Sequence, residues 1–387
     1  MESLLLNPEV SKYDGLKKAL KLSPDDILSE LEKSKLRGRG GAGFPTAKKW
    51  SFVKDASERP KFVVVNADES EPGTFKDRVL LMKNFDLVLE GLIIAGYTVG
   101  AEKGFIFLRG EFKDVYEHIV DRLKEAYSKG ILGKKVLGSD FSFDVKIYRG
   151  SGSYMSGEET ALLESMEGKP AWARGKPPFP AQKGFLGKPT LVNNVETLAN
   201  VPLIVMRGGD WYSKIGSPES PGIKLFALSG SVNRPGVYEL PMGVTLRELI
   251  FEYGKGVKGD TFFCALPGSV SSKFITDLDV KLDYYHLEQA GSMLGAGAVI
   301  VFSSKDNLLD VCENILEFFY NESCGFCVPC RIGTKKALEM FRQMRKGKGD
   351  YRSELKRLHK VMMDTCNCGL GQFALCAVVS ALERFDI

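Results

Sequence analysis

The sequence predicts an α/β domain with a largely parallel sheet, followed by a small β-rich module and a C-terminal helical bundle. Three observations lead to this prediction. Apolar strands alternate with helices between residues 62 and 154, which is typical of parallel sheets. Short strands and turns dominate from about residue 223, and helical periodicity alone follows Ser304. The predicted domains are residues 1–218, 219–304 and 305–387.

The α/β domain is expected to begin with helices and loops around a glycine-rich stretch and then to alternate strands with helices. A buried strand at Phe62–Val65 runs into the polar turn NADESEPG, and residues 79–100 form an apolar helix. Residues 103–112 hold the second strand, residues 111–130 a helix, and residues 143–154 a third strand with a glycine turn. Ligands of such sheets lie beyond the carboxyl ends of the strands, where these polar turns fall.

The two C-terminal parts have different patterns. Residues 223–254 predict strand, turn, strand and helix, and residues 297–304 predict a last strand. Four helical segments follow, as expected of a bundle. They are residues 306–323, 331–347, 351–365 and 371–385.

Composition and charge exclude several classes of function. The 387 residues include 53 Lys and Arg and 49 Asp and Glu, and the net charge of +4 is too small to indicate nucleic-acid binding. No apolar run reaches about 18 residues, so no membrane span is expected. The N-terminus has no signal-peptide pattern, and a cytoplasmic protein is predicted. The basic stretch at residues 341–360 is interpreted either as a solvated helix pair or as a docking surface for an acidic partner.

A run of cysteines is the most specific motif. The segment SCGFCVPC places Cys324, Cys327 and Cys330 in a C-x2-C-x2-C pattern. Three thiolates at this spacing are typical of a [4Fe–4S] cluster whose fourth ligand comes from elsewhere in the chain. The competing interpretation is a structural zinc site with four cysteines, which usually uses two C-x2-C pairs.

The fourth thiolate is expected from the segment DTCNCGLGQ, which offers Cys366 and Cys368. Cys368 is favoured because it directly precedes the turn Gly369–Gly371. The remaining cysteines are expected to be buried structural thiols. They are Cys264, Cys312 and Cys376.

Four segments are too polar and glycine-rich for plain connections. Glycine loops let backbone N–H groups approach a phosphate, and Lys48 or Lys49 can complement its charge. Phe44 and Phe52 flank the first segment and either stack on flat rings or fill the core. That segment contains G-x-G-x-x-G but follows a predicted helix, so the ordinary dinucleotide fingerprint is not met. The segments are RGRGGAGFPTAKKW, NADESEPGTFKDR, RGSGSYMSGEETALLES and GKPTLVNNVET.

Acidic residues gather in two of these turns. Asp68, Glu69 and Glu71 surround the turn after the first strand, where acids can hold sugar hydroxyls. A solvated acidic loop is the alternative. Glu158 and Glu159 open a predicted helix, where they either face a ligand or cap the helix.

Together these features indicate an electron-transfer enzyme. A cubane transfers one electron at a time, whereas a nicotinamide releases a two-electron hydride. A flavin converts between the two. The residues therefore predict a flavin, a nucleotide donor and a cluster in one chain.

At these motifs the sequence closely resembles a known family: the NADH-binding flavoprotein subunit of respiratory complex I, shared with diaphorase subunits of NAD-linked hydrogenases and formate dehydrogenases. The resemblance spans nearly the whole chain. It implies a Rossmann-like FMN-binding domain, a β-grasp (ubiquitin-like, SLBB) module and a four-helix bundle carrying a [4Fe–4S] cluster. The matching motifs are GRGGAGFPTAKKW, NADESEPGTFKDR, SGEETAL, KPPFPA, GKPTLVNNVETLANVP, SCGFCVPCRIGT and CGLG.

The resemblance also implies roles for individual residues. Phe44 and Phe52 would stack on the adenine of NADH, while Lys176 and Phe179 line the same cavity. The catalytic pair would be Glu71, on the adenosine ribose, and Glu159, near the nicotinamide. The implied cluster ligands are Cys324, Cys327, Cys330 and Cys368. The implied flavin contacts are Gly38, Gly40, Gly41, Lys49, Asn66, Asp68, Glu69, Tyr154, Glu158, Asn193, Asn194 and Thr197.

The sequence departs from the family pattern in a few places. Ser156 stands where CGEETAL has cysteine, and no proline occurs near Cys376. The [2Fe–2S] and ferredoxin appendages of many hydrogenase subunits are not found. Electrons are therefore expected to leave through a separate thioredoxin-like [2Fe–2S] subunit and further iron–sulfur subunits. Attachment of the protein to the inner face of the membrane through these subunits is compatible with this expectation.

Three functions remain open from the sequence. The first is NADH oxidation by a complex I-type assembly. The second is the same chemistry in reverse, reducing NAD⁺ or NADP⁺ in a hydrogenase, formate dehydrogenase or electron-bifurcating complex. The third is a non-enzymatic zinc-stabilised interaction module, against which the glycine and acid motifs argue.

Overall fold

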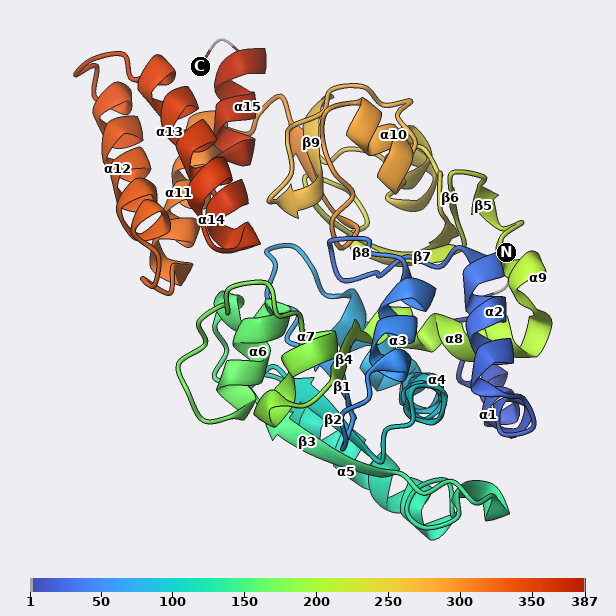
Figure 1. The fold of residues 1–387 in the computed structure, drawn as a ribbon. Helices are drawn as coiled ribbons and strands as arrows, with labels where there is room; N and C mark the ends of the chain where they lie inside the picture. The colour runs from blue at the N-terminus through green and yellow to red at the C-terminus, as the bar shows by residue number, and fades with distance from the viewer. Residues whose placement is uncertain (1–2, 386) are drawn as a thin grey trace.

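A four-stranded parallel sheet organises the N-terminal domain of the computed structural model, which describes residues 3–385 and 387 (Figure 1). The strand order is β3-β2-β1-β4, and all three pairs are parallel. The chain adds strands on one side of β1 and then crosses to the other side for β4. A topological switch therefore lies between the carboxyl ends of β1 and β4. The strands are β1 (Phe62–Ala67), β2 (Lys103–Leu108), β3 (Asp144–Arg149) and β4 (Thr190–Asn194).

Helices cover both faces of this sheet. Val63, Val65 and Ile106 pack with α4 in the larger core, while Phe62 and Phe105 face Leu162 of α6 in a smaller one. The helices are η1 (Pro8–Val10), α1 (Asp14–Ala19), α2 (Pro24–Ser34), α3 (Thr46–Asp55), α4 (Lys76–Val99), α5 (Lys113–Ser128), η2 (Val136–Gly138), η3 (Tyr154–Gly157), α6 (Glu159–Met166), α7 (Pro180–Lys183), η4 (Phe185–Gly187), α8 (Val195–Arg207) and α9 (Gly209–Tyr212).

Helices α4 and α8 form the central pair of the larger core. They approach so closely that a Cβ at Gly91 would lie 2.1 Å from the carbonyl oxygen of Leu198. Only glycine permits this crossing. The pair holds α8 rigidly at the end of β4, where the switch lies.

The middle module is a mixed sheet of order β8-β7-β10-β9. The strands that come first and last along the chain, β7 and β10, lie side by side at the centre of the sheet and are parallel. The pairs β7–β8 and β10–β9 are antiparallel. This is the predicted β-grasp arrangement. The predicted boundary at 218/219 falls inside the hairpin β5–β6, so its position stays a prediction. The elements are β5 (Gly216–Ser217), β6 (Ser220–Pro221), β7 (Ile223–Gly230), β8 (Gly236–Pro241), η5 (Glu248–Tyr253), β9 (Phe262–Val270), α10 (Tyr284–Gln289) and β10 (Ala298–Ser303).

The C-terminal helices form the predicted bundle (Figure 1). The fourth predicted helix, residues 371–385, is in fact two, because Leu375 leaves helical geometry (φ −104°, ψ 1°). The charge of the basic stretch is partly neutralised at the surface of the bundle, since Arg342 and Arg345 both pair with Glu313 of α11. The helices are α11 (Leu308–Glu322), α12 (Val328–Arg345), α13 (Arg352–Thr365), α14 (Gly369–Phe373) and α15 (Cys376–Arg384).

Among the residues that the structure describes, no helix is both long and apolar enough to cross a membrane.

Candidate functional site

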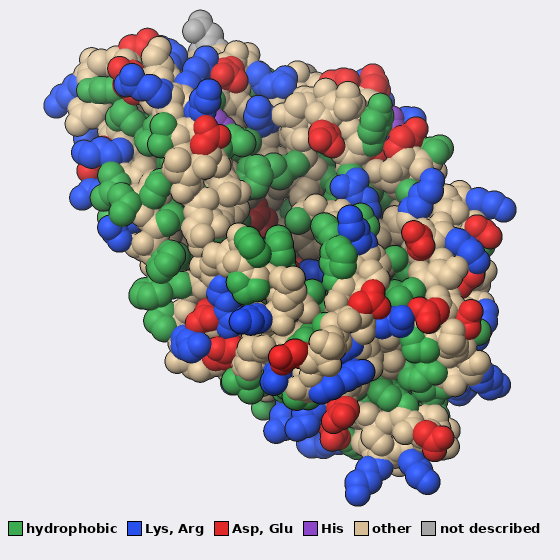
Figure 2. All heavy atoms as spheres, in the orientation of Figure 1, with side chains coloured by type: hydrophobic (Ala, Val, Ile, Leu, Met, Phe, Trp, Pro, Cys, Tyr) green, Lys and Arg blue, Asp and Glu red, His purple; other side chains and the backbone are tan. Residues whose placement is uncertain are grey.

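A cavity of about 900 Å³ lies at the switch point between β1 and β4. Figure 2 shows a hollow near the middle of the drawn face, flanked by hydrophobic side chains. The cavity walls come from the glycine loop, α3, the ends of β1 and β4, residues 157–159 and residues 176–182. Its predicted members are Gly38, Gly40, Gly41, Phe44, Lys49, Phe52, Asn66, Glu158, Glu159, Lys176, Phe179, Asn193, Asn194 and Thr197.

The glycine loop, residues 38–43, forms one wall and follows α2 instead of a strand. Gly41 has a φ of 142°, and a Cβ built there meets no atom within 4 Å. A Cβ at Gly40 would come within 3.0 Å of the Asn194 side chain. The backbone of this loop is therefore open to the cavity on one side and tightly packed on the other. Such a loop fits a bound phosphate or flavin edge.

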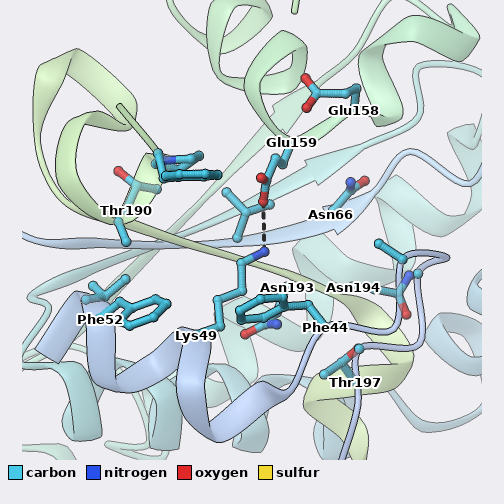
Figure 3. A pocket seen from close by; sticks show the side chains of 18 of the residues that line it. Phe44, Lys49, Phe52, Asn66, Glu158, Glu159, Thr190, Asn193, Asn194 and Thr197 are labelled. Carbon is cyan, nitrogen blue, oxygen red and sulfur yellow. Dashed lines mark hydrogen bonds and ion pairs between the residues drawn. The ribbon is translucent and has the colours of Figure 1, made fainter. Parts of the chain in front are cut away.

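Two lysines enclose one carboxylate inside the cavity. Lys49 and Lys176 each place Nζ 2.8 Å from an oxygen of Glu159, as Figure 3 shows for Lys49. Burial acts to raise the pKa of Glu159, but the two lysines outweigh it and lower this pKa to about 2. Glu159 is therefore a fixed negative charge. Lys49, one of the two lysines that the sequence offered as partners of a phosphate, is already balanced by this carboxylate.

Glu158 has the structural role that the sequence left as an alternative. Its side chain accepts hydrogen bonds from the backbone N–H groups of Thr160 and Ala161 and so caps α6. Its other oxygen lies 3.0 Å from Nζ of Lys176. The cap fixes the first turn of α6 and with it the position of Glu159.

Aromatic rings make up the outer part of the lining. Phe44, Phe52 and Phe179 are 44%, 50% and 52% exposed, although phenylalanine normally lies in the core. Phe44 and Phe52 lie on either side of Lys49 (Figure 3). Exposed rings inside a cavity suit stacking against a flat ligand.

A buried charge network supports the floor of the cavity. Asn194, in the lining, donates a 2.6 Å hydrogen bond to Asp77. Lys76 lies 2.6 Å from Asp77 and 2.9 Å from Glu196, and Lys224 of β7 reaches the same glutamate at 2.6 Å. Burial lowers the pKa of Lys224 to about 7, although Glu196 acts to raise it. Because these groups are buried and paired, they hold Asn194 in place.

Asp68 lies just behind the cavity and outside its lining. It is fully buried, and among the described residues its Oδ1 has no hydrogen-bond partner. A Cβ at Gly157, a lining residue, would lie 3.5 Å from its Oδ2. Burial raises the pKa of Asp68 to about 7. The oxygen near Gly157, Oδ2, accepts a 2.9 Å hydrogen bond from Ser70, and the unpaired Oδ1 lies 3.4 Å from the Cβ position of Gly150. A buried oxygen without a partner leaves Asp68 free to accept one further hydrogen bond.

Three other predicted contacts, Glu69, Glu71 and Tyr154, also lie outside the lining of the cavity. Glu69 accepts backbone hydrogen bonds from Asp77 and Arg78 at the start of α4, at 2.7 and 2.8 Å. Glu71 accepts hydrogen bonds from the hydroxyls of Tyr154 and Ser271, at 2.6 and 2.8 Å.

The turn around Glu71 leads away from the cavity because it packs between the other two modules. A Cβ at Gly73 would lie 3.0 Å from Ile300 of β10. The ring of Tyr154 rests against Phe318 of α11. Burial raises the pKa of Glu71. The expected contact of Glu71 with a ribose therefore stays a prediction.

The cysteine centre forms where two loops of the bundle meet. Cys324 and Cys327 lie between α11 and α12, Cys330 in the first turn of α12, and Cys366 and Cys368 between α13 and α14. A Cβ at Gly371 would lie 2.6 Å from Sγ of Cys366 and 3.1 Å from Cβ of Cys330. The two loops are therefore in contact.

The donor set of this centre is made of thiols, which both a zinc ion and an iron–sulfur cluster accept as ligands. Zinc needs its sulfurs at about 2.3 Å from one point. A cubane instead offers four separate iron atoms to four thiolates. Cys264, Cys312 and Cys376 are buried, as expected.

One short element connects the two sites. Met155 in η3 packs into the core of the bundle, and its Sδ lies 3.9 Å from Sγ of Cys368. Gly157 and Glu158, which come after Ser156, line the cavity. Asn367 also donates a hydrogen bond to Ala173. Sequence reasoning missed Met155, and no motif singles it out.

Comparisons with known proteins define the class. Residues 31–203 match the model "Nuo51 FMN-binding domain", residues 225–254 the SLBB domain, and residues 310–386 the "NADH-ubiquinone oxidoreductase-F iron-sulfur binding region". The chain therefore has the domains of an FMN- and iron–sulfur-containing oxidoreductase.

Relatives of high identity define the family. The chain is 45% identical to an NADH-quinone oxidoreductase subunit of Rhizobium meliloti, covering 96% of this chain and 90% of that one. It is 41% identical to an NADP-reducing hydrogenase subunit of Solidesulfovibrio fructosivorans, covering 96% and 77%. A solved NAD⁺-reducing [NiFe]-hydrogenase matches with a TM-score of 0.89 and 35% identity, over all of this chain and 66% of that chain. This protein belongs to the family of FMN- and iron–sulfur-binding subunits of NADH-quinone oxidoreductases.

The predicted family, fold class, enzyme class and cofactors are thereby confirmed. The matched iron–sulfur region decides against the zinc-stabilised module. The assignments of individual residues stay predictions.

Proposed function

We propose that the cavity binds FMN deep against the glycine loop and NADH toward its mouth, and that the cysteine centre receives the electrons singly. When bound, the flavin supplies the step between a two-electron hydride and single electrons. The observation that supports this most strongly is that one short segment, residues 155–158, contacts both the cavity and the cysteine centre. Met155 touches Cys368 while its near neighbours Gly157 and Glu158 line the cavity.

The deep part of the cavity suits the flavin. The backbone of Gly38, Gly40 and Gly41 and the side chain of Thr197 lie on one side, and Asn66, Asn193 and Asn194 lie at the strand ends. These groups donate or accept hydrogen bonds without carrying charge. Asp68, which is buried and has an unused oxygen, is assigned to the polar edge of the ring system.

The mouth of the cavity suits NADH. We assign the adenine to the exposed rings of Phe44 and Phe52. The nicotinamide is assigned to the neighbourhood of Glu159, where Lys49 and Lys176 hold the carboxylate ionised and fixed. In this assignment the side chains orient the donor and exclude water, and none of them forms a covalent bond to it.

The cluster ligands are assigned to Cys324, Cys327, Cys330 and Cys368. Cys368 faces Met155, and burial raises the pKa of its thiol, although the nearby backbone N–H groups of Gly371 and Leu370 act to lower this pKa. Hydrogen bonds from such groups stabilise a thiolate. Cys366 is more deeply buried, against Gly371, and remains the alternative.

The chain is assigned to a larger redox assembly in the cytoplasm. Phe326, Val328 and Ile332 are 52%, 58% and 47% exposed beside the cysteine loop. Apolar side chains in this position support docking of an electron-accepting partner. We propose iron–sulfur subunits, including a thioredoxin-like [2Fe–2S] subunit, as these partners, with attachment to a membrane only through them.

A second candidate is the reverse reaction in a hydrogenase-type complex. It is favoured by the 41% identity to a protein named for an NADP-reducing hydrogenase and by the match to an NAD⁺-reducing hydrogenase. The subunits that co-purify with the chain from its native source would distinguish the two: a hydrogenase subunit supports the second candidate, and quinone-reducing subunits support the first.

The core proposal is tested on the purified chain. We expect flavin absorption bands and a broad shoulder at about 400 nm from the cluster. The flavin bands and the shoulder should both bleach on addition of NADH. Reduction of ferricyanide by NADH measures turnover. A preparation that holds flavin and iron but does not bleach with NADH would refute the proposal.

A further inference from the structure

The β-grasp module inserts one aromatic ring into the glycine loop. The hydroxyl of Tyr284, the first residue of α10, donates a 2.6 Å hydrogen bond to the carbonyl oxygen of Gly38. The guanidinium carbon of Arg37 lies 4.3 Å from the centre of the same ring, and Arg37 Nε donates a 2.6 Å bond to the Gly43 carbonyl. Residues 37–43 thus wrap around a side chain that belongs to another module.

The fit between ring and loop is close. A Cβ at Gly43 would lie 2.7 Å from the Tyr284 ring, so this position has room only for glycine. Gly43 also has a φ of 61°, in the left-handed region. The ring therefore selects both the residue type and the backbone conformation of the loop at this point.

Tyr284 is itself rigidly held. Only 7% of it is exposed, and it packs in the apolar core of the β-grasp module. The preceding residue, Asp283, caps α10 by accepting a hydrogen bond from the backbone of His286 and also binds the hydroxyl of Ser217. The support under the loop is thus part of a folded module.

The loop needs such support. Residues 38–43 include four glycines, which lose more conformational freedom on ordering than other residues. The same loop supplies Gly38, Gly40 and Gly41 to the deep part of the cavity and leads into Phe44 at its mouth. A loop that is ordered before ligands arrive binds them more tightly.

We infer that Tyr284 is a positioning residue, through which the β-grasp module presets the glycine loop for FMN and for the adenine end of NADH. The inference rests on the proposed function. Tyr284 does not line the cavity and touches neither ligand in this assignment. It acts through Gly38 and Gly43.

The test replaces the hydroxyl and keeps the ring. In Tyr284→Phe we expect the dissociation constant for FMN, titrated into flavin-free protein by fluorescence quenching, to rise about fivefold, the effect of one lost hydrogen bond. We also expect KM for NADH to rise, while kcat of the flavin-loaded protein stays within about twofold. Tyr285→Phe is the matched control, because Tyr285 is 47% exposed and is the next residue along the helix.

Three outcomes are distinguishable. Unchanged FMN affinity and KM in Tyr284→Phe would overturn the inference, and a lowered melting temperature without these changes would show a purely structural role. Failure of the wild-type protein to bind FMN would instead overturn the proposed function.

A double-mutant cycle tests the ring itself. Gly43→Ala should weaken FMN binding more in the wild-type background than together with Tyr284→Ala, since the second change removes the clash. Circular dichroism and the cluster spectrum verify folding of each variant. Strictly additive effects on FMN affinity would contradict coupling between ring and loop.

Discussion

The cysteine centre and the cavity are built in opposite ways. The cysteines come from two short segments, 324–330 and 366–368, whose spacing already indicates the cluster. The cavity draws on segments spread from residue 38 to residue 197. A site made of neighbours in sequence can be recognised as a motif, whereas a site assembled by the fold depends on contacts that no local pattern reveals.

The largest expected effect concerns the cysteine centre. Cys368→Ala should lose roughly a quarter of the iron or the whole cluster, because one iron of the cubane loses its thiolate. Flavin content should be unchanged. Iron analysis and the visible spectrum measure both. Cys366→Ala is the matched control and should keep the cluster; the reverse pattern would make Cys366 the fourth ligand.

The next effect belongs to the cavity. Glu159→Gln removes the charge that lies between Lys49 and Lys176 and leaves two cations without their partner. We expect kcat/KM for NADH to fall about 10- to 100-fold, or about 1.4–2.7 kcal/mol. Steady-state kinetics with ferricyanide measure it. Glu167→Gln, which removes ion pairs to Lys169 and Arg174 outside the lining, is the control. Equal kcat/KM values for NADH in both variants would show that Glu159 takes no part in the reaction with NADH.

A smaller effect concerns the buried acid behind the cavity. Because the folded pKa of Asp68 is about 7, the flavin-free native state keeps a proton that the unfolded chain releases near about pH 4. The difference between the two pKa values of Asp68 contributes to the free energy of unfolding. This contribution is fully present below about pH 4 and is lost as pH rises through about 7. Asp68→Asn should therefore raise the free energy of unfolding by about 1–3 kcal/mol at about pH 8 and change it little at about pH 4.

Urea unfolding of flavin-free protein at both pH values measures this difference, with the exposed Asp140→Asn as control. Equal stability of Asp68→Asn and wild type at the higher pH would show that Asp68 is ionised there without cost.

The smallest expected effect concerns Glu71. If its carboxylate approaches the ribose 2′-hydroxyl, it repels a 2′-phosphate, and Glu71→Gln should raise the NADPH to NADH activity ratio. The carboxylate lies outside the lining and is held by Tyr154 and Ser271. We therefore expect a rise of only about twofold, measured by parallel kinetics with the two donors. No change in the ratio would exclude Glu71 from nucleotide selection.

Much of the fold could be predicted because its causes are local. The apolar strand at Phe62–Val65, the helical periodicity after Ser304 and the cysteine spacing each lie within a few residues. The break at Leu375 could not be predicted, since no glycine or proline marks it. The double role of Glu158, as helix cap and as lining residue, needed the structure.

The sequence by itself determined the order of the domains and showed the glycine loop and the cysteine motifs. Patterns of burial, turns and metal ligands each lie within a short stretch of chain and can be recognised there. Only the tertiary structure decided that Lys49 pairs with Glu159, 110 residues away, and that Tyr284 supports Gly38 from 246 residues away. It also decided that Glu71 faces the other modules. Such contacts depend on how separate elements pack, and packing is a property of the whole chain.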